Sequence, residues 1–126
     1  MCHQIDWEER RVSVVYSGHC TEAEVLDVVI KLQSDYRFDA LRHALHDFRR
    51  CESMSGSSEA LEELAARNRG AAASNSRLRI AVIADRLDVL AMLDRFASIG
   101  LSPYLLLAFA DAESAKGWLG ISPADT

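Results

Sequence analysis

Apolar and polar residues alternate near the start of the chain, which is the pattern of a β-strand with one buried face. Val12, Val14 and Tyr16 hold the apolar positions and are separated mainly by polar ones. One face of this segment is therefore expected to be buried. Residues 5–7, which precede the polar residues 8–10, have a composition that suits a partner strand. We predict that the chain opens with an antiparallel hairpin.

Two segments with helical periodicity follow. Thr21 and Glu24 have capping-box spacing, in which the Thr21 hydroxyl accepts from the Glu24 amide and the Glu24 carboxylate reaches back. The apolar residues of this helix form one stripe that would pack on a sheet: Val25, Val28, Val29 and Leu32. A second helix is predicted to begin at Ser58, where acidic residues complement the helix dipole, and to end at Gly70.

Two more helices are predicted in the second half of the chain. Asp85 or Asp88 is placed to cap the third, and Gly100 to end it. The fourth begins at Asp111. Trp118 lies at helical spacing from the apolar residues of this last helix, so we expect a core residue that anchors the helix, not a ligand platform.

Three further strands complete the pattern. Residues 41–48 have the mixed polarity of a short strand and are followed by a polar stretch, 49–58, which we interpret as a loop. Residues 78–84 are almost continuously apolar, as a central parallel strand should be, and 104–109 form another apolar run. Alternating strands and helices favour a largely parallel sheet with right-handed crossovers. The sequence predicts one α/β domain over residues 1–126, with a mostly parallel sheet, an N-terminal antiparallel hairpin and about four helices.

Composition narrows the class of protein. The 126 residues are 49% hydrophobic and 26% charged, which is ordinary globular usage and predicts one core. The net charge of -5 opposes sequence-independent nucleic-acid binding, which depends on many contacts of Lys and Arg to phosphates. No apolar run approaches the roughly 20 residues of a transmembrane helix. The N-terminal segment lacks the features of a signal peptide, so we expect a cytoplasmic protein.

The chain has three cysteines, an odd number without CxxC spacing. Cys2, Cys20 and Cys51 are expected to be reduced thiols and not a disulfide framework.

Four short motifs follow one another along nearly the whole chain. They are GHCTEAE at 18–24, HD at 46–47, RIAVIAD at 79–85 and FADAESAKGWL at 109–119. Together they resemble the small bacterial SpoIIAA-like proteins of the STAS group, and the similarity extends to CRAL-TRIO lipid-binding domains. The resemblance implies an α/β fold of STAS type. STAS domains typically bind protein partners and sometimes a nucleotide or lipid, so it also implies a regulatory or interaction module.

The phosphorylation switch of the antagonists in this group does not carry over directly. Those proteins have an Asp-Ser-Ser-Gly motif, whose first serine is phosphorylated. The matching register here is residues 53–56, where Ser53 replaces the aspartate and Met54, which has no hydroxyl, stands at the phosphoacceptor position. A displaced phosphosite remains open at the neighbouring serines: Ser55, Ser57 and Ser58.

Ligands of open α/β sheets usually bind at the carboxyl ends of the parallel strands. The candidate binding residues at this edge are His19, Asp47, Arg49, Arg50, Ser55, Gly56, Ser57, Ser58, Asp85 and Arg86, with Asp111 nearby. Arg49 and Arg50, followed by the helix N-terminus at Ser58, could hold an anion. A solvated loop with a serine cap is the simpler interpretation, because the glycine spacing of phosphate-binding loops is missing.

A metal site is conceivable but not favoured. His19, Cys20, His46 and Cys51 are possible ligands on two neighbouring segments. However, His43 and His46 on one strand point to opposite faces, and no compact ligand pair is found elsewhere. We expect no metal and no other cofactor.

Catalysis is not favoured either. A nucleophilic Cys20 or Cys51 would need contact with an imidazole and an orienting group. Asp47 and Asp85 could pair as carboxylates, but they are explained more simply. Asp47 would accept backbone hydrogen bonds within its loop, and Asp85 would cap a helix. We therefore assign no catalytic residue.

Two hypotheses about function remain. The first is a non-enzymatic regulatory or protein-interaction module of STAS type, which docks a protein partner or a second copy of itself, as a possible homodimer. The second is a small-ligand carrier that binds a lipid, nucleotide or other anion at the carboxyl-end loops. The sequence does not identify the ligand or partner.

Overall fold

The computed structural model describes residues 3–56, 58–100 and 102–121. Its elements are β1 (His3–Glu8), β2 (Arg11–Thr21), α1 (Glu22–Ser34), the 3-10 helix η1 (Tyr36–Ala40), β3 (His43–Ser55), α2 (Ser58–Ala71), β4 (Arg79–Ile83), α3 (Leu87–Ile99), β5 (Leu105–Phe109) and α4 (Ala112–Leu119). The strands lie in the order β1-β2-β3-β4-β5. β1 and β2 are antiparallel and the other neighbours are parallel. The predicted α/β architecture, with its N-terminal hairpin, is confirmed.

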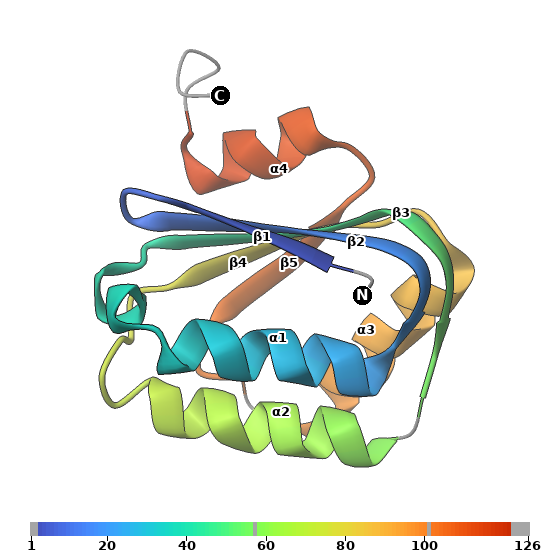
Figure 1. The fold of residues 1–126 in the computed structure, drawn as a ribbon, viewed down its shortest axis with the longest axis horizontal. Coiled ribbons are helices and arrows are strands. Elements are labelled where there is room, and N and C mark those ends of the chain that lie inside the picture. Colours follow the sequence, from blue (N-terminus) through green and yellow to red (C-terminus); the bar gives the residue numbers. More distant parts are fainter. Residues whose placement is uncertain (1–2, 57, 101, 122–126) are drawn as a thin grey trace.

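The helices cover the two faces of the sheet unequally. α1, α2 and α3 lie on one face, and α4 lies on the other (Figure 1). The large apolar cluster fills the space between the sheet and the three helices. A smaller cluster joins α4 to β3 and β4, through residues such as Leu45, Ala81 and Leu119. No helix of the described segments is long and apolar enough to span a bilayer.

β2 and β3 continue beyond the rest of the sheet as a paired extension, which we call the β2–β3 arm. It consists of residues 17–21 of β2 and 50–55 of β3. The pairing of β1 with β2 ends at Tyr16, and that of β3 with β4 ends at Asp47. In Figure 1 the arm curves past the ends of α1 and α2.

The register of β3 shifts twice where the arm begins. Val15 pairs with Asp47, whereas Ser17 pairs with Arg50, so β3 carries one extra residue at this point. A second shift after Gly18 adds another. A bulge of this kind changes which side of a strand the following residues face.

The bulges explain why this part of the chain looked like a loop. The buried residues of β3 are here three positions apart and not two: Phe48, Cys51 and Met54. The polar residues between them face outward. Our interpretation of 49–58 as a loop is therefore wrong for residues 49–55, which are strand.

The start of α1 confirms half of the predicted capping box. The Thr21 hydroxyl accepts a hydrogen bond from the backbone N–H of Glu24 at 3.2 Å. In place of the predicted bond back to the Thr21 N–H, the structure gives a contact of the Glu24 carboxylate with His3 Nδ1 at 3.3 Å. This contact ties the first strand to α1.

The predicted cap of α3 is wrong. The N-cap position is Arg86, without a side-chain capping bond, so neither Asp85 nor Asp88 has that role. Asp88 lies in the first turn and accepts from the backbone N–H of Met54 at 2.9 Å. It therefore fastens the arm to α3. Gly100 follows the last residue of α3, as predicted.

α4 is correctly placed, but its tryptophan is not a core residue. The Asp111 carboxylate accepts from the backbone N–H of Ser114 at 2.7 Å and caps the helix. Leu119 is buried, whereas Trp118 is only partly buried beside Phe109. Since α4 is the only described helix on this face, its tryptophan lies at the rim of a small cluster.

We predict that Leu119→Ala destabilises the protein more than Trp118→Ala. The side chain of Leu119 is 3% exposed, and its loss should lower the free energy of unfolding by about 2 to 5 kcal/mol. Trp118→Ala removes a partly exposed ring and should cost about 1 to 2 kcal/mol. Urea denaturation of both variants measures the difference. A greater loss for Trp118→Ala would contradict the placement of the two side chains.

Candidate functional site

The carboxyl ends of β3, β4 and β5 gather charged side chains around Arg49. Its guanidinium donates to both carboxylate oxygens of Asp47, with Nη2 2.7 Å from Oδ2. The hydrogen bond with Asp47, followed by the charges of Asp47, Asp111 and Asp85, raises the pKa of Arg49. Burial alone would raise the pKa of Asp47, but hydrogen bonds from Arg49 outweigh it and lower this pKa. We call these four residues the strand-end cluster.

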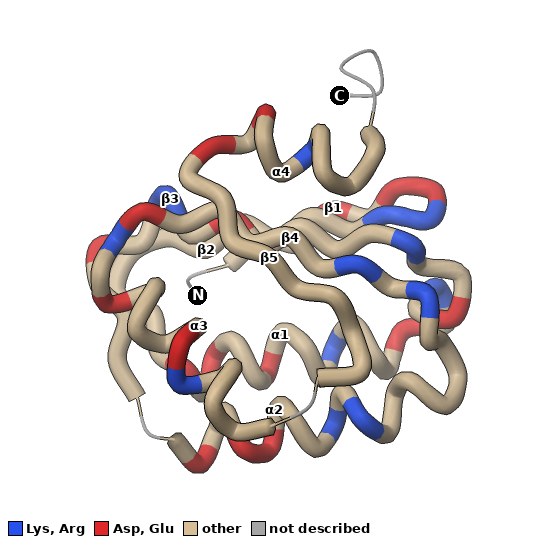
Figure 2. The backbone as a smooth tube through the Cα atoms, turned by 180° about the vertical axis from the view of Figure 1, so that it is seen from behind, with Lys and Arg blue, Asp and Glu red and all other residues tan. Residues whose placement is uncertain are grey.

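The strand-end cluster does not have the charge of an anion site. Arg49 is neutralised by Asp47, and two more carboxylates lie near it. Arg86 is likewise paired with Asp88, at 3.0 Å between Nε and Oδ1. Arg50 is the third arginine that we considered for binding an anion. It is exposed and has no ion pair among the described residues. Figure 2 shows acidic and basic segments side by side at this end of β3.

Hydrogen bonds also fix the outer face of the arm. His19 on β2 and Ser53 on β3 are neighbours, with 2.8 Å between Nδ1 and Oγ. The other ring nitrogen of His19 lies 4.0 Å from the Glu52 carboxylate. Just before the arm, the backbone N–H of Arg49 donates to Asp47 at 3.0 Å, which is the role that we expected for Asp47. The arm thus presents polar groups, and charges of both signs, from two paired strands.

The tip of the arm leads into α2. Ser55, Gly56 and Ser58 are exposed, and Ser57 lies outside the described residues. Gly56 has φ 154°, and a Cβ atom there would lie 2.7 Å from the Cβ of Glu22. Only glycine fits this close approach without a shift of the chain.

Sequence reasoning missed the buried carboxylate beneath this tip. Glu22 is fully buried at the start of α1 and forms an ion pair with Arg95 of α3. Its Oε1 atom has no hydrogen-bond partner in the described part of the chain. In the sequence, Glu22 is indistinguishable from the other acidic residues of a helix start, so no local signal identifies it.

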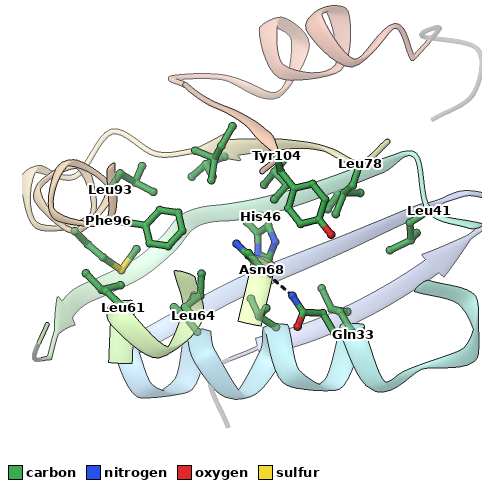
Figure 3. Close-up of a pocket in the computed structure, with 18 of the residues that line it drawn as sticks. Gln33, Leu41, His46, Leu61, Leu64, Asn68, Leu78, Leu93, Phe96 and Tyr104 are labelled. Carbon is green, nitrogen blue, oxygen red and sulfur yellow. Dashed lines mark hydrogen bonds between the residues drawn. The ribbon is translucent and has the colours of Figure 1, made fainter. Parts of the chain in front are cut away.

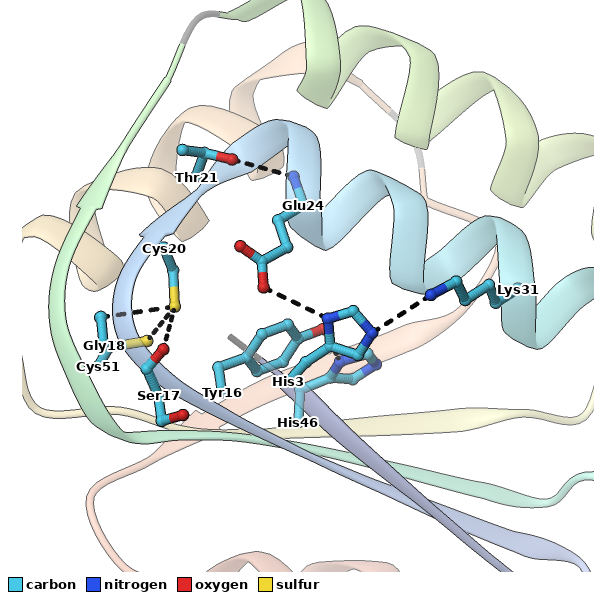
Figure 4. A network of polar contacts seen from close by, with 10 residues as sticks. All are labelled: His3, Tyr16, Ser17, Gly18, Cys20, Thr21, Glu24, Lys31, His46 and Cys51. Carbon is cyan, nitrogen blue, oxygen red and sulfur yellow. Dashed lines mark hydrogen bonds and ion pairs between the residues drawn. The ribbon is translucent and has the colours of Figure 1, made fainter. Parts of the chain in front are cut away.

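Two cysteines meet on the inner side of the arm (Figure 4). Cys20 and Cys51 are buried and form no disulfide, and their Sγ atoms are 3.2 Å apart. The possible metal ligands are not assembled, since His19 is exposed on the outer face and His46 is buried in the core. Within residues 3–56, 58–100 and 102–121, no group of three ligating side chains could hold a metal ion.

A buried tyrosine–histidine pair was also missed. The Tyr16 hydroxyl and His46 Nδ1 are 2.9 Å apart beneath α1 (Figure 4). Burial raises the pKa of Tyr16 well above its ordinary value and lowers the pKa of His46 to about 4. Both side chains are therefore neutral at pH 7. Tyr16 follows the strand alternation. The sequence does not show, however, that its hydroxyl contacts His46 on the neighbouring strand.

No protein-family model matches the sequence, and no curated protein matches it either. Among solved structures, the anti-sigma factor antagonist SpoIIAA in its unphosphorylated form is similar, with a TM-score of 0.59 and 15% sequence identity. The match covers 94% of this chain and 99% of that chain. The chain has the SpoIIAA-like STAS fold. This confirms the resemblance that the four motifs indicated.

Residues 53–56, which we matched to the Asp-Ser-Ser-Gly motif, lie at the end of β3 and just before α2. Met54 is buried, and Asp88 accepts from its backbone N–H. The Ser53 hydroxyl is held by His19. Met54, which the sequence register matches to the phosphoacceptor, is thus enclosed in the core, while Ser55 and Ser58 are the exposed hydroxyls that the structure describes here.

We predict that all three cysteines of the sequence react when the protein is unfolded without a reductant. Cys20 and Cys51 are thiols in contact, without a bond between them. Titration with a chromogenic disulfide reagent counts them. A single reactive thiol per chain would show that Cys20 and Cys51 are oxidised to a disulfide in the isolated protein.

The low pKa of His46 predicts a loss of stability in mild acid. The unfolded chain takes up a proton near the ordinary pKa of 6.5, whereas the folded chain does so only near 4. The free energy of unfolding should therefore fall as the pH is lowered from 6.5 to 4, by about 3 kcal/mol from this group. His46→Asn keeps an acceptor for Tyr16 and removes the titration. Denaturant melts across this pH range give the free energy of unfolding as a function of pH, and this curve should be flatter for the variant. Parallel curves for the wild type and the variant would contradict the low pKa of His46.

Proposed function

We propose that the chain is a regulatory module of STAS type that works by binding a protein partner and performs no chemistry of its own. The observation that carries this proposal is the match over nearly the full length of both chains to a structure described as an anti-sigma factor antagonist. Such a protein acts on another protein. At this level of identity the likeness concerns the fold, so the binding surface must be argued from this chain's own residues.

The arm and the strand-end cluster are the surface that we assign to the partner. Their polar side chains are held by paired strands and by the contacts Arg49–Asp47 and His19–Ser53. Groups fixed in this way lose little conformational entropy on binding. Charges of both signs, placed at fixed positions, select a partner with the complementary pattern.

A small anion at the same edge has less support. Arg49 and Arg86 already neutralise Asp47 and Asp88, and the cluster contains more carboxylates than guanidinium groups. An incoming phosphate or carboxylate would have to displace these internal partners. A protein surface can instead match the mixed charge without displacing them. A second copy of the chain is the alternative partner, and the experiment below separates the two.

We predict that the double variant Arg49→Ala, Arg50→Ala binds the partner about tenfold more weakly at low salt, because the edge changes from mixed to acidic. The salt dependence should also decrease. The partner is first identified by mass spectrometry of complexes isolated from the host with the tagged full-length protein. Its affinity for the wild type and the variant is then measured by calorimetry at two salt concentrations.

The matched control is Arg67→Ala, Arg69→Ala on the last turns of α2. It removes the same two charges and also breaks one ion pair, Arg67 with Glu63 at 3.0 Å. This control should bind like the wild type, and both variants should melt within a few degrees of it. If the two double variants bind the partner with equal affinity, the arm is not part of the binding surface. If only further copies of this chain are recovered, the partner is a second copy and the complex is a homodimer.

A further inference from the structure

The two edge strands of the sheet differ in the side chains that they present. β1 forms one edge and β5 the other. The exposed side chains of β1 are polar or charged: Gln4, Asp6 and Glu8. Charges on an edge strand discourage its pairing with a further strand. β5 lacks this protection, because all five of its residues are apolar and its register with β4 contains no shift.

The side chains of β5 alternate between the two faces of the sheet. Leu106 and the preceding Tyr104 lie on the side of α1, α2 and α3, where they line a small apolar cavity of about 70 Å³ (Figure 3). Leu105, Leu107 and Phe109 lie on the side of α4. Of these three, Phe109 packs in the cluster beneath α4. Leu105 and Leu107 are left 63% and 47% exposed.

The backbone of β5 also leaves groups unpaired at this edge. The Phe109 carbonyl accepts from the backbone N–H of Ala84, just after β4, at 2.9 Å. Alternate residues of a strand turn their N–H and C=O groups to the same side, so the odd-numbered residues of β5 face β4. Leu106 and Ala108 then direct theirs away from β4. Outside the ladder with β4, no backbone hydrogen bond of the described residues uses these two residues.

These two residues are placed symmetrically about Leu107. If an identical strand runs antiparallel to β5 with Leu107 opposite its own copy, Leu106 of each chain faces Ala108 of the other. Such a pair exchanges two N–H···O bonds. The same register places Leu105 opposite Phe109 of the other copy, on the side of α4. The open backbone groups and the exposed leucines of β5 are thus used together.

The distribution of charge favours this edge for contact between copies. The chain carries a net charge of -5, so two copies repel one another. No charged residue occurs between positions 102 and 110. At a two-fold axis each side chain meets itself, and a charge there would face a like charge. Leu107 avoids this repulsion.

We propose that two copies of the chain associate through β5, antiparallel and with Leu107 on the two-fold axis, so that their sheets join into one. Backbone hydrogen bonds of Leu106 and Ala108 hold the two strands together. The apolar row on the side of α4 packs against the same row of the second copy. One edge strand from each copy buries less area than a standard interface, so the dimer is weak and depends on concentration. The arm takes no part in this contact.

Sedimentation velocity of the full-length protein tests the proposal, from about ten micromolar to about one millimolar. We expect the weight-average mass to rise from that of one chain toward that of two. Leu107→Lys should weaken the dimer at least about tenfold, because it sets two like charges face to face. The side chain is half exposed in the single chain, so the variant should keep its fold. A wild type that stays monomeric over this range would overturn the proposal.

A mixture of two variants tests the register itself. Leu107→Lys and Leu107→Glu should each be monomeric alone and should associate when mixed, since position 107 of one copy faces position 107 of the other. No association in the mixture would contradict the pairing.

A backbone variant provides an independent test. Ala108→Pro removes an N–H group that points away from β4, so it should weaken the dimer severalfold and leave the melting temperature within a few degrees. A dimer that persists unchanged in both Ala108→Pro and Leu107→Lys would overturn the proposal.

Two controls separate this contact from other surfaces. Leu87→Lys places a charge on another exposed leucine, at the start of α3 and beside the arm, and should dimerise like the wild type. The Arg49→Ala, Arg50→Ala variant should also dimerise like the wild type, although it binds the protein partner more weakly. Loss of the dimer in this double variant, with the dimer retained in Leu107→Lys, would place self-association on the arm and overturn the proposal.

Discussion

The parallel ladder between β2 and β3 is the constraint on which the proposed partner surface depends. It runs from the pair Arg11 and His43 to the pair Thr21 and Ser55, beyond the ends of both neighbouring strands. The inner side of the ladder carries the Tyr16–His46 pair and the two cysteines. The outer side of its extension carries the polar groups of the arm. A change of register would therefore displace the core and the surface together.

The two faces of this ladder carry different kinds of contact. Outside, His19 with Ser53 and Arg49 with Asp47 give fixed, solvated groups of both charges. Inside, the neutral His46 pairs with the Tyr16 hydroxyl in apolar surroundings. Solvent screens the first kind of contact, whereas burial strengthens the second.

The sequence predicted the elements whose periodicity is regular. The alternation of Val12, Val14 and Tyr16 and the apolar run at 78–84 correspond to β2 and β4. The arm was not predicted, because two bulges give the buried residues of β3 a spacing that matches neither a strand nor a helix. The burial of Trp118 was overestimated, since helical spacing shows which face is apolar but not how much of the sheet lies against it.

The gathering of charged residues at the carboxyl edge was predictable from the sequence, but their side-chain partners were not. Parallel topology was enough to bring Asp47, Asp85 and Asp111 to one edge. That Arg49 is neutralised there depends on side-chain partners that the sequence does not specify. The buried Glu22 and the cavity were not predictable at all, because each arises from segments that are far apart in the chain. The space left between packed side chains produces no local pattern in the sequence.

Amide hydrogen exchange along β3 tests the central claim most directly. If residues 50–55 form a strand of the parallel ladder, amides of this segment that donate to β2 should exchange slowly, as should those of the preceding residues 43–47. Protection should extend to the paired residues 17–21 of β2. Fast exchange over 50–55, together with protection of 43–47, would show that this segment is a loop. It would contradict the fixed surface and the register on which the account depends.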